Sequence, residues 1–234
     1  MPEFRRPHHR AVAALLAAMD SKFLERAECW FGGGTQIALS LDEYRESRDI
    51  DFLCSSRKGF RLLRETVTEG SLGALARRPI ALARELRIDR DGIRGFPKHG
   101  DVRIKFEIVL EARIDLAGHL DKRLGVPVLS AECVAAEKFL ANADRGLDTS
   151  TSSRDAIDLA FLAAAHGPEA LVPGLRIAES AYGTEIRRRL TAVLAMFGAR
   201  RGYAAQCARS LGIEDTTTLR RGLTLLRKLA GQKP

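Results

Sequence analysis

Long apolar runs are absent from this sequence of 234 residues, which argues against a membrane protein. The apolar stretch at residues 11–19 ends at Asp20 and has roughly half the length of a membrane span. It also lacks the cleavage-site context of a signal peptide. We therefore expect a cytoplasmic protein that does not associate with a membrane.

Cysteines are few and widely separated, and none forms a C-x-x-C pair, so zinc-type spacing is missing. A disulfide framework is not expected in a chain of this length, and buried free thiols are predicted instead. Aromatic residues make up only 6%, whereas Ala and Leu are frequent, which weakly favours helices. The four cysteines are Cys29, Cys54, Cys133 and Cys207.

Acidic residues are outnumbered by basic ones, which gives a formal net charge of +8. A basic surplus suits an acidic partner such as nucleic acid or nucleotide phosphates. A basic protein that binds no nucleic acid fits the charge equally well. His8 and His9 lie in a basic N-terminal segment that is expected to be solvated rather than to bind metal.

Strand patterns are concentrated before about residue 130 and helical patterns after it, so we predict an α+β fold. Residues 102–110 show the clearest strand, with Lys105 and Glu107 on its polar side. We assign residues 1–130 to a core and 131–234 to a helical region. Helices are expected at 9–26, 57–75, 131–143, 153–166, 179–197, 204–211 and 216–229, strands at 29–31 and 50–53, a short strand or turn at 126–130, and a hairpin at 86–96.

A glycine run and a pair of carboxylates form the first chemical pattern. Gly33, Gly34 and Thr35 would let backbone N–H groups approach phosphate oxygens, although a flexible turn is the commoner structure. Asp49 and Asp51 are two residues apart in a predicted strand and therefore project on one face. Their mutual repulsion is relieved by a divalent cation such as Mg²⁺, which prefers oxygen ligands and shares them with phosphates.

Glu107 offers a third carboxylate from the polar side of the 102–110 strand. It could hold a metal that activates an attacking hydroxyl. The alternative is a solvated side chain paired with Lys105 or Arg103. The pattern alone does not choose between the two.

These motifs resemble those of the polymerase-β-type nucleotidyltransferases and, more closely, the AbiEii/AbiGii-type nucleotidyltransferase toxins. The loop motif of that family, G-G-T followed by R-x-S-x-D-I-D, matches Gly33 to Asp51, including Arg45 and Ser47. Its K-x-E strand matches Lys105 and Glu107. Its A-E-K-x-x-A and R-D-x-x-D-L helices match residues 136–141 and 154–159, so four motifs occur in order over residues 31–160.

The resemblance implies catalytic weight on Lys138 and Asp155. Lys138 would neutralise charge on a triphosphate, and Asp155 would orient Lys138 or act as a base. The alternatives are a solvated helix face for Lys138 and a favourable position at a helix start for Asp155, where Ser152 or Ser153 could cap. Asp158, one turn further, could hold Arg154 or Lys138.

The leading hypothesis is a Mg²⁺-dependent nucleotidyltransferase that moves a nucleoside monophosphate from an NTP to an acceptor hydroxyl. The resemblance implies RNA, especially tRNA, as the acceptor, and a toxin paired with an antitoxin protein. Two alternatives remain: a nucleotide-binding module that acts through a partner, and a small-molecule nucleotidyltransferase. The implied metal ligands are Asp49, Asp51 and Glu107, and the implied nucleotide-binding residues are Gly33, Gly34, Thr35, Ser47 and Lys138.

Overall fold

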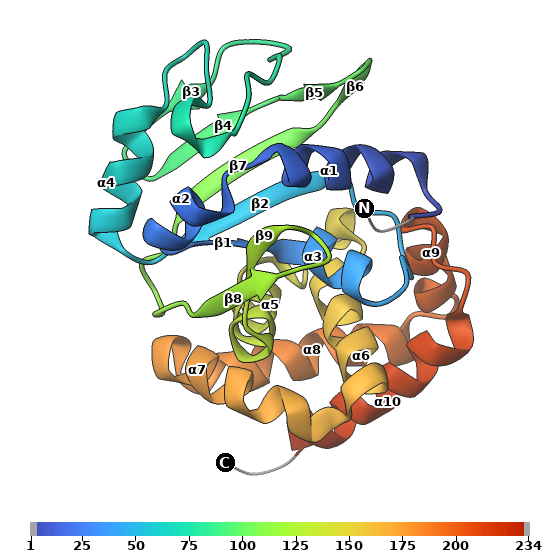
Figure 1. Ribbon diagram of the computed structural model, residues 1–234. Helices are drawn as coiled ribbons and strands as arrows, with labels where there is room; N and C mark the ends of the chain where they lie inside the picture. Colours follow the sequence, from blue (N-terminus) through green and yellow to red (C-terminus); the bar gives the residue numbers. More distant parts are fainter. Residues whose placement is uncertain (1–3, 232–234) are drawn as a thin grey trace. The chain divides into compact units, whose positions relative to one another are not determined.

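The computed structural model describes residues 4–231, and the chain clusters into two compact units (Figure 1). The first unit consists of the residues up to Leu39 together with Ser47–Ser130. The second consists of Ser40–Glu46 and the residues from Ala131 onward. The short segment Ser40–Glu46 therefore clusters with the helices that follow it by more than 80 residues.

Within residues 4–231, the first unit contains a mixed sheet of seven strands in the order β3-β4-β7-β2-β1-β9-β8 (Figure 1). β2 runs parallel to β7 and β1 runs parallel to β9, whereas the other neighbours are antiparallel. The strands are β1 (Cys29–Gly32), β2 (Asp49–Cys54), β3 (Arg87–Ile88), β4 (Gly92–Gly95), β7 (Lys105–Leu110), β8 (Gly118–Asp121) and β9 (Val126–Leu129).

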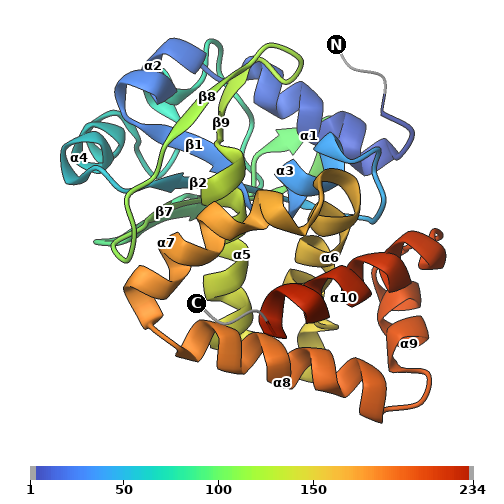
Figure 2. The same cartoon turned by 90° about the horizontal axis from the view of Figure 1, so that it is seen from below.

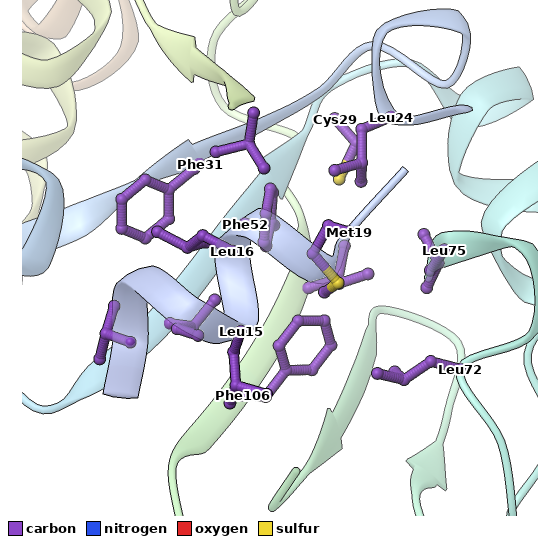
Figure 3. Packing of buried hydrophobic residues seen from close by; sticks show 14 of the residues in the cluster. Leu15, Leu16, Met19, Leu24, Cys29, Phe31, Phe52, Leu72, Leu75 and Phe106 are labelled. Atoms are coloured by element: carbon purple, nitrogen blue, oxygen red, sulfur yellow. The ribbon is translucent and has the colours of Figure 1, made fainter. Parts of the chain in front are cut away.

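The core of the first unit lies on one face of this sheet. Buried and less buried residues alternate along β2 and along the first part of β7, and Phe52 and Phe106 are among the buried ones, because successive side chains of a strand point to opposite faces. Leu16 and Met19 pack on these rings, as Figure 3 shows. The opposite face carries the polar residues of the same strands. The alternation therefore places the apolar core on one face of the sheet and the candidate catalytic carboxylates on the other.

The helices of the first unit are shorter than the sequence patterns predict. The helix expected at residues 9–26 is two helices, because Met19 adopts an extended conformation and the Asp20 side chain caps the second by accepting from Phe23 N–H at 2.8 Å. The helix expected at 57–75 ends at Thr66. The helices are α1 (Pro7–Ala18), α2 (Ser21–Arg26), α3 (Gly33–Ser40) and α4 (Arg57–Thr66), followed by a 3₁₀ turn, η1 (Gly73–Leu75).

The strand expected at residues 102–110 is interrupted at Ile104. Its first part, β6 (Val102–Arg103), pairs with β5 (Lys98–His99) in a separate two-stranded sheet, and Gly100 in the turn has φ +57°. Val102 is consequently exposed and does not join the buried face of Ile104 and its successors. The expected hairpin at 86–96 is confirmed as β3 and β4.

The second unit is helical (Figure 2). Two glycines allow close contacts between its helices. A Cβ at Gly222 would lie 2.1 Å from the carbonyl oxygen of Ala160, and one at Gly174 would lie 2.6 Å from Ala135 Cβ. The helices are α5 (Ala131–Arg145), α6 (Arg154–His166), α7 (Val172–Tyr182), α8 (Glu185–Ala199), α9 (Tyr203–Ser210) and α10 (Thr216–Gly231), with 3₁₀ turns η2 (Thr149–Thr151) and η3 (Pro168–Leu171).

The prediction of a single helix at residues 179–197 is wrong, because α7 ends just before Gly183 and α8 begins just after it. This glycine has φ +59°, a conformation that L side chains rarely adopt and that stops an α-helix. The four cysteines are free and buried, as predicted. No helix within residues 4–231 is both long enough and apolar enough to cross a membrane.

Candidate active site

Three of the predicted carboxylates lie on the same face of two neighbouring strands. Asp49 and Asp51 are half-buried on β2 and alternate with buried Ile50. In the parallel pairing of β2 with β7, Asp51 is in register with Glu107 and Asp49 with Lys105. Neighbouring strands are about 4.8 Å apart, so this pairing places Glu107 next to Asp51 and Lys105 next to Asp49.

Glu107 is already held by two cations. Lys105 Nζ lies 2.9 Å from Glu107 Oε2, and Arg94 Nε of β4 lies 3.5 Å from Oε1. The pKa of Lys105 is raised above its ordinary value. Partial burial lowers this pKa, but the hydrogen bond to Glu107 and the negative charge of Glu107 outweigh burial, and the charges of Asp49 and Asp51 raise it further. Among residues 4–231, no three His, Cys, Asp or Glu side chains converge closely enough to hold a metal ion.

Gly33 joins the end of β1 to α3 and lies directly against Asp51. Its φ is +71°, and a Cβ built on it would lie 2.7 Å from Asp51 Oδ2. Glycine is required here for two independent reasons, the backbone conformation and the space that the carboxylate occupies. Gly34 follows in the first turn of α3, where backbone N–H groups have no partner within the helix.

Thr35 and Ser47 connect the two halves of the loop motif. Their hydroxyl oxygens are 2.7 Å apart, and the Thr35 residue is buried with 1% exposure. The backbone N–H of Ser47 donates to Nε2 of His9 in α1 at 3.1 Å. His9 is fully buried, so its expected solvation is wrong, and it anchors the backbone two residues before Asp49.

The second unit holds a buried cluster of ion pairs around Lys138 of α5. Its Nζ lies 3.0 Å from Asp155 Oδ1 and 2.7 Å from Asp158 Oδ2, both on α6. The Lys138 residue is only 5% exposed, so a solvated helix face is excluded. Of the two partners considered for Asp158, the structure selects Lys138.

The electrostatics of this cluster keep all its members charged. Burial alone would lower the pKa of Lys138, but the charges of Asp158 and Asp155 raise it above the ordinary value. Burial would raise the pKa of Asp155, but Lys138 and Arg145 hold it well below the usual range. A carboxyl with so low a pKa is a poor proton acceptor, so the geometry favours Asp155 as a residue that positions Lys138 rather than as a base.

Tyr44 and Arg45 fix the segment Ser40–Glu46 to the same cluster. The Arg45 guanidinium is bidentate on Asp158, with Nε–Oδ1 at 2.7 Å and Nη2–Oδ2 at 3.0 Å. The Tyr44 hydroxyl donates to Asp158, and its ring stacks on Phe161 with centroids 3.9 Å apart. The arginine of the family motif therefore acts within the second unit, two residues before Ser47 of the first.

The start of α6 differs from the capping arrangement that the sequence suggests. Ser153 stands at the N-cap with φ +47° and makes no side-chain cap. Its hydroxyl instead lies 2.9 Å from the hydroxyl of Tyr203. Asp155 in the first helical turn is held by Lys138 and by Arg145, whose Nε lies 2.8 Å from Asp155 Oδ2.

The motif order and this geometry agree with a comparison against protein families. The family described as the nucleotidyl transferase AbiEii toxin of a type IV toxin–antitoxin system matches residues 14–220. The chain belongs to the AbiEii family. It is accordingly a nucleotidyltransferase of a toxin family whose members are paired with an antitoxin.

Two solved structures share the fold of this chain. JHP933 from Helicobacter pylori is 15% identical, with a TM-score of 0.56, and the similarity covers 97% of this chain and 94% of that one. A candidate nucleotidyltransferase from H. pylori is also 15% identical, with a TM-score of 0.55 and coverage of 95% and 93%. The curated proteins contain no match. The predicted α+β nucleotidyltransferase fold is confirmed.

The AbiEii motif residues thus form one group in each unit. Asp49, Asp51, Glu107 and the Gly33–Thr35 turn belong to the first, and Lys138 with Asp155 belongs to the second. Sequence reasoning missed His9, Tyr44 and Arg94. Of these three, only Arg94 has a sequence pattern that indicates its position, because it lies in the expected hairpin and therefore on a strand. The antiparallel pairing of β4 with β7, which brings Arg94 to Glu107, is not predicted by the sequence pattern.

Proposed function

We propose that this AbiEii-family enzyme transfers a nucleoside monophosphate from an NTP to a hydroxyl group of RNA and releases pyrophosphate. The observation that supports this most directly is the placement of Asp49 and Asp51 on one face of β2, with Gly33 against Asp51. Carboxylates beside a glycine turn suit a metal–triphosphate ligand, because the turn leaves room for phosphate oxygens.

The donor set of β2 fits Mg²⁺. This ion is usually bound by one or two carboxylates and completes its shell with water and substrate phosphates. In the proposal Asp49 and Asp51 hold it, and Glu107 is a third ligand only after it releases Lys105 or Arg94. A bound Mg²⁺ would supply charge neutralisation at the reacting phosphate.

The chain's own residues bind and orient the nucleotide. Gly33 and Gly34 present N–H groups of the first turn of α3, and this helix end favours negative charge. Thr35 and Ser47 share a hydrogen bond that fixes the turn against the strand carrying the aspartates. We assign the triphosphate to this turn.

The reaction is a displacement at the α-phosphorus. The acceptor hydroxyl oxygen forms a bond to the α-phosphorus, and the bond from that phosphorus to the bridging oxygen of the β-phosphate breaks. Pyrophosphate leaves with the electron pair, and the hydroxyl proton passes to a carboxylate of the group or to water. The family resemblance gives Lys138 a phosphate-neutralising role, and within the second unit Asp155 positions Lys138 through their ion pair of 3.0 Å.

RNA is the acceptor that the composition favours. A net charge of +8 attracts a polyanion, whereas a cationic small molecule would require an acidic pocket. Within RNA the proposal extends to tRNA, and the biological setting is the cytoplasm, where the toxin meets its antitoxin. The charge does not distinguish one RNA from another, so the acceptor is identified by experiment.

The test is incubation with each α-³²P-labelled NTP, Mg²⁺ and total RNA. We expect labelled RNA with the native enzyme, and a loss of at least about 100-fold in Asp51→Asn, which keeps the shape but not the charge. Asp101→Asn, an exposed aspartate of the same unit, is the matched control and should be fully active.

Three other outcomes would contradict the proposal. If Asp51→Asn still incorporates nucleotide into RNA in a Mg²⁺-dependent way, the aspartate pair is not required for the reaction. Tight NTP binding without turnover would indicate a binding module. Label that appears only in small molecules would indicate a small-molecule nucleotidyltransferase.

A further inference from the structure

A pocket of about 410 Å³ opens at the edge of the sheet beside the carboxylates of the first unit. It is lined by Arg94 of β4 and by Lys105 and Glu107 of β7. Arg84, Phe96 and Arg87, the register partner of Arg94 on β3, also line it. Lys105 and Glu107 are the register partners of Asp49 and Asp51, so the pocket is one strand away from the aspartate pair.

The pocket has the charge of an anion site. Four cationic side chains and two carboxylates line it, and one of these carboxylates, Glu107, is held between Lys105 and Arg94. The Arg84 and Arg87 residues are exposed, so their guanidinium groups can reach a bound phosphate. Asp89, next to the pocket, is ion-paired with Arg94 at 2.7 Å and lies 3.7 Å from Arg87. With Asp89 included, four cations face three carboxylates, and this surplus favours negative charge.

The pocket also offers a flat surface. The Arg84 guanidinium lies over the Phe96 ring, with its carbon 4.3 Å from the centroid. Two hydrogen bonds of 2.8 Å fix the backbone there, from Ala83 N–H to Phe96 O and from Lys98 N–H to Ala81 O. A planar cation held on a rigid aromatic ring is suited to stacking against a base while its edge donates to phosphate.

The order of strands separates this pocket from the glycine turn. In the order β4-β7-β2-β1, the pocket lies at β4 and β7, the aspartate pair on β2, and Gly33 follows β1. The triphosphate assigned to the glycine turn is thus on the other side of the carboxylates. An in-line displacement needs the attacking and leaving oxygens on opposite sides of the phosphorus, so the pocket stands where the acceptor is required.

We propose that this pocket binds the single-stranded end of the acceptor RNA, with a base stacked on Arg84 and Phe96 and phosphates held by Arg84 and Arg87. This inference rests on the proposed function, because it assigns the second substrate of the same site. The terminal hydroxyl of the strand then lies toward Glu107 and the aspartates. A single strand is required, since the faces of a base inside a duplex are already stacked on its neighbours.

The test measures binding of RNA and of NTP separately. The RNA probe is a fluorescein-labelled single-stranded oligomer of about 12 nucleotides, titrated by anisotropy over a series of salt concentrations. The variants are Arg84→Ala/Arg87→Ala and Phe96→Leu. The matched control is Arg61→Ala/Arg64→Ala, which removes two exposed arginines from α4 of the same unit. Circular dichroism and thermal melting establish that each variant is folded.

We expect the double arginine variant to weaken RNA binding by about tenfold and to reduce the slope of log K against log salt by about 1.4. Phe96→Leu should weaken binding by about tenfold with an unchanged slope. A blunt duplex of the same sequence should bind equally to all variants. Binding of Mg²⁺–NTP should change by less than about twofold in every variant.

The outcomes separate the pocket from the proposed function. Unchanged RNA binding in both pocket variants overturns the inference, and so does an equal loss of NTP binding, which would make the pocket a triphosphate site. If the native enzyme transfers no nucleotide but binds RNA through Arg84 and Phe96, the proposed function fails and the pocket stands. If the native enzyme labels RNA but the pocket variants bind and label RNA as well as the native enzyme does, the pocket inference fails and the proposed function stands.

Discussion

The backbone N–H of Ser47 donates a hydrogen bond of 3.1 Å to Nε2 of His9. A neutral imidazole has one donor and one acceptor nitrogen, so His9 carries its proton on Nδ1 and is uncharged in this arrangement. The contact joins a residue near the start of α1 to the loop that leads into β2. His8 adds a second contact to the same loop, with Nε2 2.9 Å from Arg48 O.

The first prediction concerns this anchor. His9→Phe keeps the buried ring and removes the acceptor, so Ser47 N–H is left unpaired at a cost of about 1–3 kcal/mol. The loop before Asp49 should loosen, and we expect a fall of about tenfold or more in nucleotide transfer. Steady-state transfer and urea unfolding measure the two effects. His119→Phe, exposed on β8, should change neither, and full activity in His9→Phe would show that the anchor is dispensable.

Gly33→Ala should damage activity far more than stability. The added Cβ would face Asp51 Oδ2 at 2.7 Å and would also strain a residue with positive φ, at a cost of about 1–2 kcal/mol. Displacement of the Asp51 carboxylate should reduce transfer by about 100-fold. Gly70→Ala is the matched control, because nothing lies within 4 Å of its Cβ. Transfer at the native rate in Gly33→Ala would refute the placement of Asp51 beside this turn.

Thr35→Val replaces the hydroxyl by a methyl group of similar size. The hydrogen bond to Ser47 is lost, which leaves one polar oxygen without its partner and costs about 1 kcal/mol. We expect KM for NTP to rise by about five- to tenfold, because the turn that holds the phosphates is less well fixed. Thr35→Ser restores the hydroxyl and should restore KM. If Thr35→Ser is as impaired as Thr35→Val, loss of the hydrogen bond to Ser47 is not the cause of the higher KM.

Asp158→Asn tests the buried cluster. It leaves Lys138 and Arg45 without a fully charged partner, and we expect a loss of about 3–5 kcal/mol in the free energy of unfolding. Urea titration followed by circular dichroism measures the loss. Asp144→Asn, exposed on α5, should be close to native. A variant as stable as the native protein would mean that the cluster contributes nothing to the fold.

Acid should destabilise the native protein through the same cluster. The pKa values of Asp155 and Asp158 are lowered in the folded state, relative to about 3.9 in the unfolded chain. The unfolded chain therefore takes up protons first as the pH falls. The stability from these carboxylates is complete above about pH 5 and is lost progressively below pH 4. The melting temperature should fall less steeply below pH 4 in Asp158→Asn, and parallel curves would contradict the assignment.

The local chemistry of the site could be predicted because it depends on short-range periodicity. Alternation in Asp49, Ile50 and Asp51 determines that both carboxylates share a face, whatever the rest of the sheet does. The same rule places Glu107 on the polar side of its strand. The pairing of β2 with β7 that brings the two sets together is a long-range choice, and the residues of neither strand encode it.

The failures have local causes as well. The region expected to form one helix at 9–26 contains Asp20, which caps the start of a second helix. The periodic apolar pattern continues past Asp20 without a break, so the pattern does not indicate that one helix ends and another begins there. The charged neighbours of His9 and its position near the N-terminus predict a solvated side chain. The side chain is buried instead, and this burial results from tertiary packing. Tyr44 had no motif to mark it, since its hydroxyl partner lies 114 residues further along the chain.

The membership of Ser40–Glu46 in the second unit has a consequence for biosynthesis. Tyr44 and Arg45 leave the ribosome long before Asp158, which is their partner. A nascent or prematurely terminated chain of fewer than 158 residues therefore lacks the carboxylate that Tyr44 and Arg45 bind, whereas the contact of Ser47 with His9 is already available to it. The segment Ser40–Glu46 can thus make its final contacts with Asp158 only after 158 of the 234 residues have been translated.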